Sequence, residues 1–263
     1  MNGFERHRID HSSVSAINAW EETPDQWVAR YVLKMKTAGS AAMWRGICAE
    51  EIVVDVLAKD IRFDVALASA LAKFDKMNGG IGLGLDDKVM KERAILGPIA
   101  TLAIHELRQY GKPEFYDDGG QHKVSLTAKG EGWEIPVIGY LDLVYPQHGL
   151  VVDLKTTTKM PSRLSASHRR QRCFYQRCSG NSKVRFLYVT PKKIGWLDDG
   201  DVDAELALMK QQLARQEAFL SLGDAETLRR AVPVNPNHYF WRGSENHIRT
   251  TQMELGHMVR LFK

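Results

Sequence analysis

Residues 139–158 read Gly-Tyr-Leu-Asp-Leu-Val-Tyr, then Pro-Gln-His-Gly, then Leu-Val-Val-Asp-Leu-Lys-Thr-Thr-Thr. Two apolar runs thus flank a short segment that contains Pro146 and Gly149, which are residue types that tight turns favour. The stretch predicts a β-hairpin. Because both of its strands are mostly apolar, we expect the hairpin to lie at the centre of a larger sheet.

Each predicted strand carries an acid in the middle of its apolar run. Side chains alternate between the two faces of a strand, so Asp142 shares a face with Tyr140 and Asp153 shares one with Lys155. Burying an unpaired carboxylate costs free energy, and some group must neutralise these two acids. A divalent cation is the natural candidate. The alternative is that Asp153 and Lys155 form an ordinary ion pair near a strand end.

A third acid interrupts a helical pattern. The helix predicted over residues 41–59 places Glu50 on its apolar line, whereas Glu51 points elsewhere. Gly46, one turn before, leaves the helix surface bare beside this acid. We therefore expect Glu50 to face a functional site, although an exposed Glu at the edge of the line is the alternative. The apolar positions on this line are Met43, Ile47, Val54 and Leu57.

The length and composition favour one domain of the α/β class, in its α+β form. The 263 residues are 44% hydrophobic and 26% charged, which is enough for a full core. We expect a central mixed sheet flanked by helices. Within the single domain 1–263, the segments are a helical N-terminal part (12–111), a sheet core (121–197), and a C-terminal helix and tail (201–263).

Several protein classes are excluded at this stage. No apolar run of about 18 residues predicts a membrane span, and the N-terminus lacks the apolar core of a secretory signal. Three irregularly spaced cysteines, Cys48, Cys173 and Cys178, form neither a disulfide framework nor a zinc site by themselves. We expect a soluble, cytoplasmic protein. The net charge of +4 is compatible with a polyanionic partner without requiring one.

The N-terminal region predicts two helix starts. Ser12 and Ser13 precede a short helix, where their hydroxyls could cap it or contact a phosphate. Thr23 and Gln26 have the spacing of a capping box, with Pro24 at the first helical position. We expect a helix over 24–36.

The remaining pattern alternates helices and strands. Helices are predicted over 61–76, 86–110 (broken or kinked at Gly97-Pro98), 163–179 and 201–222, and strands over 121–128, 184–190 and 194–197. On the helix over 163–179, Gln171 and Tyr175 are one turn apart and share a face. This helix also holds the densest basic cluster of the chain: His168, Arg169, Arg170, Arg172 and Arg177.

Five motifs in this order give the chain a resemblance to the RecB-like and phage lambda-exonuclease-like branch of the PD-(D/E)XK nuclease superfamily. The match spans residues 11–191, and each motif alone is short. The motifs are a serine-rich segment (Ser12-Ser13) leading to a Pro and aromatic helix start (Pro24 to Trp27), Gly46-x-x-x-Glu50, Gly139-x-x-Asp142, Asp153-x-Lys155-Thr156, and Gln171-x-x-x-Tyr175.

The resemblance implies a restriction-endonuclease-like core whose catalytic residues are Glu50, Asp142, Asp153 and Lys155. The three acids would hold one or two Mg²⁺ or Mn²⁺ ions, with the backbone carbonyl of Leu154 as a further ligand. Three carboxylates about 5 Å apart repel by roughly 3 kcal/mol per pair at an effective dielectric of 20, and bound cations reverse this cost. Relatives with an iron–sulfur cluster use four cysteines, mostly near the C-terminus, so no cluster is expected here.

The same resemblance assigns nucleic-acid contacts. Gln171 and Tyr175 would position the DNA and support the site. Contacts to phosphate groups give affinity without sequence readout, which suits a nuclease that is indifferent to sequence. The hypothesised phosphate contacts are Ser12, Ser13, Arg45, Thr156, Arg169, Arg170 and Arg172.

The sequence therefore predicts a divalent-metal-dependent DNA exonuclease, encoded by a phage or bacterium, that acts on linear duplex ends in recombination or repair. A structure-specific or sequence-specific endonuclease on the same core is the enzymatic alternative. A non-catalytic DNA-binding protein that kept the fold is the alternative from another class. The resemblance also suggests a homo-oligomeric ring and a single-strand annealing protein as a partner, and no membrane partner is expected.

Overall fold

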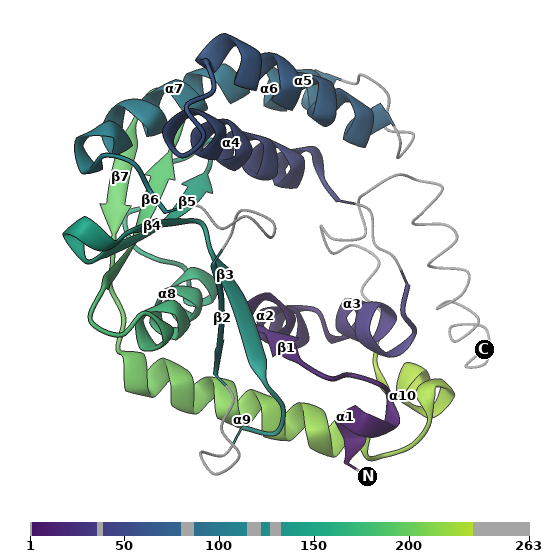
Figure 1. Cartoon of the computed structure of the whole chain (residues 1–263). Coiled ribbons are helices and arrows are strands. Elements are labelled where there is room, and N and C mark those ends of the chain that lie inside the picture. Colours follow the sequence, from purple (N-terminus) through teal and green to yellow (C-terminus); the bar gives the residue numbers. More distant parts are fainter. Residues whose placement is uncertain (1, 36–38, 80–86, 115–121, 127–132, 234–263) are drawn as a thin grey trace. The chain divides into compact units, whose positions relative to one another are not determined.

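Two β-sheets, each flanked by helices, organise the computed structural model of the chain (Figure 1). The structure describes residues 2–35, 39–79, 87–114, 122–126 and 133–233. It is a mixed α/β structure, as the sequence predicts. Contacts between residues divide the chain into two units, Met1–Ala38 with Ser125–Gly139 and Asp203–Lys263, and Gly39–Val124 with Tyr140–Val202.

The first unit is mainly helical. Ser12–Ser13 (β1) pairs in parallel with Val137–Leu141 (β3), and the three-stranded sheet has the order β1-β3-β2, with β2 formed by His122–Leu126. The helices are α1 (Gly3–Arg6), α2 (Val14–Glu22), α3 (Pro24–Trp27), the π-helical turn η1 (Val28–Val32), α9 (Val202–Leu220) and α10 (Ala225–Ala231).

The second unit holds a four-stranded mixed sheet in the order β4-β5-β6-β7. Its strands are β4 (Leu143–Tyr145), β5 (Leu150–Thr156), β6 (Lys183–Val189) and β7 (Ile194–Leu197). β5 and β6 are parallel, and the other two pairs are antiparallel. Its helices are α4 (Ala41–Leu57), α5 (Phe63–Gly79), α6 (Asp87–Ala94), α7 (Leu96–Leu107), α8 (Ala166–Cys178) and the short 3₁₀ turns η2 (Arg108–Tyr110) and η3 (Pro146–His148).

The predicted hairpin is present as β4-η3-β5. Leu143 pairs with Val152 and Tyr145 with Leu150, so the register closes on the turn. Gly149 ends this turn with φ = 53°, a left-handed conformation that glycine adopts without the steric cost of a side chain.

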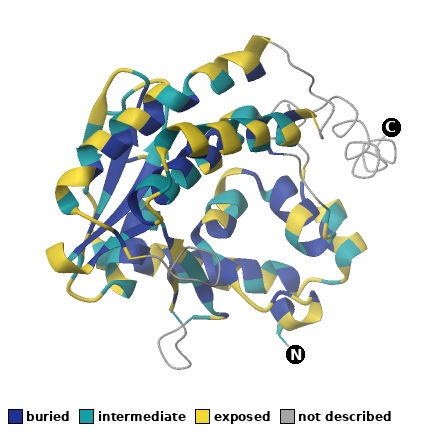
Figure 2. Ribbon diagram, turned by 45° about the horizontal axis from the view of Figure 1, so that its top comes forward, coloured by how far each residue is buried: buried dark blue, intermediate teal, exposed yellow. Residues whose placement is uncertain are grey.

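The two faces of β5 have different surroundings. Leu150, Val152 and Leu154 belong to the hydrophobic core formed with α4, α5 and α7. Asp153 and Lys155 point to the opposite face, where α8 follows, because side chains alternate along the strand. Figure 2 shows the central strands of this sheet, β5 and β6, as largely buried.

Several local predictions differ from the structure. Thr23 makes no capping hydrogen bond; its hydroxyl donates to the Ala19 carbonyl instead, and the helix over 24–36 is replaced by α3 and the turn η1. Pro24 does stand at the start of α3. The helix over 86–110 breaks at Ile95, just before the predicted Gly97-Pro98, which fall in the first turn of α7.

Only half of the apolar residues predicted to form the buried line of α4 are buried. Val54 and Leu57 are buried, but Met43 and Ile47 are 45% and 38% exposed. The first two turns of α4 instead bury Arg45 and Cys48, because a tether to the end of β5 sets the orientation of the helix there. None of the described helices has the length and apolar character to cross a membrane.

Candidate active site

Asp153 and Lys155 occupy one face of β5 and form an ion pair. Lys155 Nζ lies 2.6 Å from Asp153 Oδ1, at ion-pair distance but without the geometry of a hydrogen bond. The Asp153 side chain is 1% exposed, and its Oδ2 atom has no hydrogen-bond partner among the described residues. Burial raises the pKa of Asp153, and the Lys155 charge only partly offsets this.

Asp142 lies in the bend between β3 and β4, where the chain leaves one sheet and enters the other. The sequence predicted one continuous strand here. Asp142 Oδ2 accepts a hydrogen bond of 3.0 Å from the backbone N–H of Leu154, beyond the last residue pair of β4 and β5. Burial, followed by the charges of Glu50 and Asp153, raises the pKa of Asp142 well above its usual range.

The charges of Glu50 and the two aspartates all act on Lys155. Burial lowers the pKa of Lys155, but the charges of Asp153, Asp142 and Glu50 together raise it above its usual value. Glu50 is half-buried on α4, whereas Glu51 forms an ion pair of 2.7 Å with Lys73, as its different direction predicts. The structure thus brings the four predicted catalytic residues into mutual electrostatic range.

The donor set can be tested for its fit to a divalent cation. Hard carboxylate oxygens are the ligands that Mg²⁺ and Mn²⁺ prefer, and the unpartnered Asp153 Oδ2 is such an oxygen. Within the described ranges, however, no three carboxylate, imidazole or thiol groups stand at the spacing of a metal site. The chemistry of the acids fits a cation, while their side chains would have to turn toward it. The Leu154 carbonyl remains a predicted ligand.

Arg45 and Thr156 tether α4 to the end of β5. The Arg45 guanidinium donates to Thr156 Oγ1 at 3.2 Å and to the Thr156 carbonyl at 3.1 Å, and it also pairs with Glu92. A Cβ atom at Gly46 would meet only Thr156 Oγ1, at 3.6 Å, so this position is close to β5 without requiring glycine. Arg45 is 5% exposed, so its guanidinium is engaged within the protein, and its hypothesised contact with phosphate stays a prediction.

Helix α8 gives a mixed result for the predicted DNA contacts. Gln171 Nε2 donates to the Tyr175 hydroxyl at 3.1 Å, which confirms that they share a face. Arg170 and Arg172 are buried, and Arg172 donates to the Asp198 carbonyl at 2.6 Å. Their hypothesised contacts with phosphate stay predictions. Arg169 is half-buried.

The two serines belong to the first unit. Ser13 caps α2, since its hydroxyl accepts a hydrogen bond of 3.2 Å from the Ala16 N–H, which confirms the capping alternative. Ser12 is buried in β1, where it pairs with Val137. The hypothesised phosphate contacts of the two serines stay predictions.

Sequence reasoning missed one feature beside Lys155. His168, counted above among the basic residues, hydrogen-bonds through Nδ1 to the Tyr188 hydroxyl, and Tyr188 is the strand neighbour of Lys155. Burial, followed by the Lys155 charge, lowers the pKa of His168 to about 4, so the ring is neutral at pH 7. The available signal was weak, because nothing in the sequence links His168 to a tyrosine 20 residues away.

Comparisons with known proteins do not place the chain in a family. No family model matches, and no curated protein matches. One solved structure, described as "Crystal structure of SSO0001", shares 15% identity and aligns over 65% of this chain and 85% of its own, with a TM-score of 0.35. At this TM-score we draw no conclusion from the likeness.

Proposed function

We propose that this protein is a divalent-metal-dependent deoxyribonuclease, most closely an exonuclease that hydrolyses DNA from its ends. The observation that carries the proposal is the pair of buried aspartates, Asp142 and Asp153, set around Lys155 with raised carboxyl pKa values. A protein without a ligand for them keeps two buried acids at a cost to its stability. This arrangement is expected where acids are kept to bind a cation.

In the proposed mechanism, Glu50, Asp142 and Asp153 would hold the cation, which supplies charge stabilisation at the scissile phosphate and lowers the pKa of water. Lys155 keeps its proton next to Asp153 and places a positive charge where negative charge develops on the phosphate. Its Nζ also lies over the Phe186 ring, 5.1 Å from the centroid, which restricts the side chain. Orientation of the attacking water by Lys155 is part of the proposal.

The surrounding residues would position rather than react. Arg45, through Thr156, holds α4 and hence Glu50 against the end of β5. Gln171 and Tyr175 form a hydrogen-bonded pair on α8, and the charges of Asp153 and Asp142 act on the Tyr175 hydroxyl, raising its pKa further after burial. Tyr175 is thus a neutral hydroxyl next to the acids, suited to orient a phosphate or a water molecule.

One observation favours a second candidate, a non-catalytic DNA-binding protein. Asp153 is already neutralised in part by Lys155, and no three-group cation site is assembled among the described residues. An endonuclease on the same residues is the other alternative. These candidates differ in metal dependence and in the form of DNA that they attack.

The deciding experiment is degradation of a linear duplex labelled at the 5′ or the 3′ end, with Mg²⁺ or with chelator, beside a closed circular duplex. Metal-dependent loss of the linear DNA alone supports the exonuclease, and the label reports its polarity. Nicking of the circle would indicate an endonuclease. Absence of cleavage with Mg²⁺ and with Mn²⁺ would contradict the proposal.

Two neighbouring glutamates provide a matched pair of variants. Glu50→Gln should reduce cleavage strongly, since it removes a proposed ligand. Glu51→Gln makes the same chemical change one residue away, on a side chain that pairs with Lys73 instead. Equal activity of the two variants would remove Glu50 from the mechanism.

A further inference from the structure

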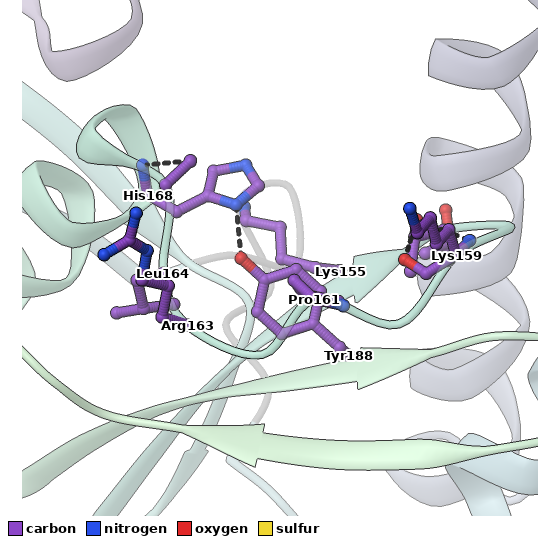
Figure 3. Close-up of a pocket in the computed structure, with 10 residues that line it drawn as sticks. Lys155, Lys159, Pro161, Arg163, Leu164, His168 and Tyr188 are labelled. Carbon is purple, nitrogen blue, oxygen red and sulfur yellow. Dashed lines mark hydrogen bonds between the residues drawn. The ribbon is translucent and has the colours of Figure 1, made fainter.

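A hollow of about 470 Å³ opens beside Lys155, where the chain passes from β5 to α8 (Figure 3). Its lining comes from the end of β5, the loop over 157–165, the first turn of α8 and Tyr188 of β6. All of these segments belong to the second unit. Of the motif residues, only Lys155 and Thr156 line it.

The hollow is lined by three cationic side chains: Lys155, Lys159 and Arg163. Lys159 and Arg163 are exposed, and neither pairs with a carboxylate within the described part of the chain. In Figure 3, they lie on opposite sides of the lining. Two cations without a carboxylate partner among the described residues thus line one hollow, and the summed positive potential of a cleft lined by one sign of charge favours an anionic ligand.

Acids are nearly absent from its wall. Residues 156–165 contain no Asp or Glu. Asp199 Oδ1 accepts a hydrogen bond of 3.2 Å from the Leu164 N–H, but Asp199 does not line the hollow. Because the buried Asp153 pairs with Lys155, Lys159 and Arg163 carry most of the positive charge that no acid balances.

The polar wall on the α8 side is fixed in place. Ser165 caps α8 by accepting a hydrogen bond of 3.2 Å from the His168 N–H. His168 and Tyr188 point toward each other and hydrogen-bond, so the neutral imidazole forms a rigid side of the hollow. Pro161 and Leu164 add apolar surface. A small anion alone would leave most of this volume empty, whereas a phosphate with its attached sugar uses both the charges and the apolar surface.

We infer that this hollow binds a phosphate group of the nucleic-acid strand, separate from the phosphate that is cleaved, through Lys159 and Arg163. The inference rests on the proposed function for the identity of the ligand as DNA. Two sources share this chemistry: the terminal phosphate of a strand end and an internal backbone phosphate. Either would fix the position of the strand relative to Lys155.

The test is binding of a short, internally labelled DNA duplex by fluorescence anisotropy, in chelator and over a range of salt concentrations. We expect Arg163→Ala and Lys159→Ala each to weaken binding on the order of five- to tenfold at low salt. Each should also reduce the slope of log K against log salt by about 0.9, since one phosphate contact is lost. Lys76→Ala and Arg108→Ala remove exposed charges elsewhere and serve as matched controls.

Three forms of the duplex distinguish the two sources. If a duplex with a 5′-phosphate or a 3′-phosphate binds more tightly than one with only hydroxyl ends, and Arg163→Ala abolishes this difference, the ligand is the terminal phosphate. An equal loss for all three forms indicates an internal phosphate. Affinities and slopes of Arg163→Ala and Lys159→Ala that match the controls would overturn the inference.

The design separates this inference from the proposed function. Binding is measured without metal, so it does not depend on cleavage. A protein that binds DNA through Arg163 but never cleaves it would support the phosphate site and contradict the proposed nuclease activity. A protein that cleaves DNA, with binding unchanged in both variants, would support the nuclease activity and contradict the phosphate site.

Discussion

The acidic centre of the second unit (Glu50, Asp142 and Asp153) and the basic hollow beside it adjoin at Lys155. The charged groups of the two sites differ in their exposure to water. Asp142 and Asp153 are buried, and their pKa values are raised because burial disfavours their charged forms. Lys159 and Arg163 are exposed and carry their charges in water. A buried charge costs free energy, which a bound ligand of opposite charge can offset. An exposed charge without a partner remains available to attract a ligand.

The arginines of this unit make the same distinction. Arg45 and Arg172 carry the same guanidinium group as Arg163, but protein groups already accept hydrogen bonds from them. A count of basic residues in the sequence cannot separate the two kinds. Only the structure shows that Lys159 and Arg163 of the loop before α8 are exposed, whereas Arg170 and Arg172 of the helix are buried.

The largest expected effect breaks the acidic centre. Asp153→Asn and Lys155→Ala should each lower the cleavage rate by a factor on the order of 10³, because the first removes a proposed cation ligand and the second removes a positive charge at the scissile phosphate. The measurement is single-turnover cleavage of the labelled linear duplex, with circular dichroism as a control for folding. Full activity in a folded Lys155→Ala protein would contradict the mechanism.

A smaller effect is expected at the tether between α4 and β5. Arg45→Met should lower the free energy of unfolding by about 2–3 kcal/mol, because it leaves Glu92 and the Thr156 carbonyl without their buried donor. Urea unfolding measures this change. Arg108→Ala, at an exposed position, is the control and should change stability by less than about 0.5 kcal/mol. Equal stabilities would show that the tether does not hold α4.

A third variant measures how much free energy of folding a buried acid costs. Asp142→Asn should stabilise the metal-free protein by about 1 kcal/mol at pH 7, because the amide keeps the hydrogen bond from Leu154 without a buried charge. The folded pKa of Asp142 lies above the unfolded value, so its charge costs stability above the folded pKa. That cost disappears as the pH falls through the raised pKa, and the variant should lose its advantage there.

Thermal unfolding in chelator, at pH 7 and at mildly acidic pH, gives this comparison. Added Mg²⁺ should raise the melting temperature of the natural protein more than that of Asp142→Asn, since the variant lacks a proposed ligand. A variant that is less stable than the natural protein at pH 7 in chelator would contradict this account.

The hairpin was predictable because its signals are local. The turn residues Pro146 and Gly149 and the apolar runs beside them act over a few residues, and strands 194–197 and 183–189 were found in the same way. Within the site, alternation along β5 sufficed to place Asp153 and Lys155 on one face. The spacing of Gln171 and Tyr175 likewise predicted their contact.

The rest depended on tertiary contacts that the sequence does not display. The exposure of Met43 and Ile47 follows from the tether at Arg45, which involves a threonine 111 residues away. The Thr23 hydroxyl had two partners within reach, and it bonds the Ala19 carbonyl rather than capping α3. The hollow was not predicted, because Lys159 and Arg163 match no motif. The part of the predicted C-terminal tail after residue 233 lies outside the described residues.

The hydrogen bond from Leu154 to Asp142 has one further consequence. The Leu154 amide proton is held by a carboxylate whose charge depends on its surroundings, so its NMR chemical shift should follow the protonation of that carboxylate. Titration with acid, with Mg²⁺ or with DNA would each move this single resonance. One backbone amide thus provides a probe of the acidic centre that requires no cleavage and no substitution.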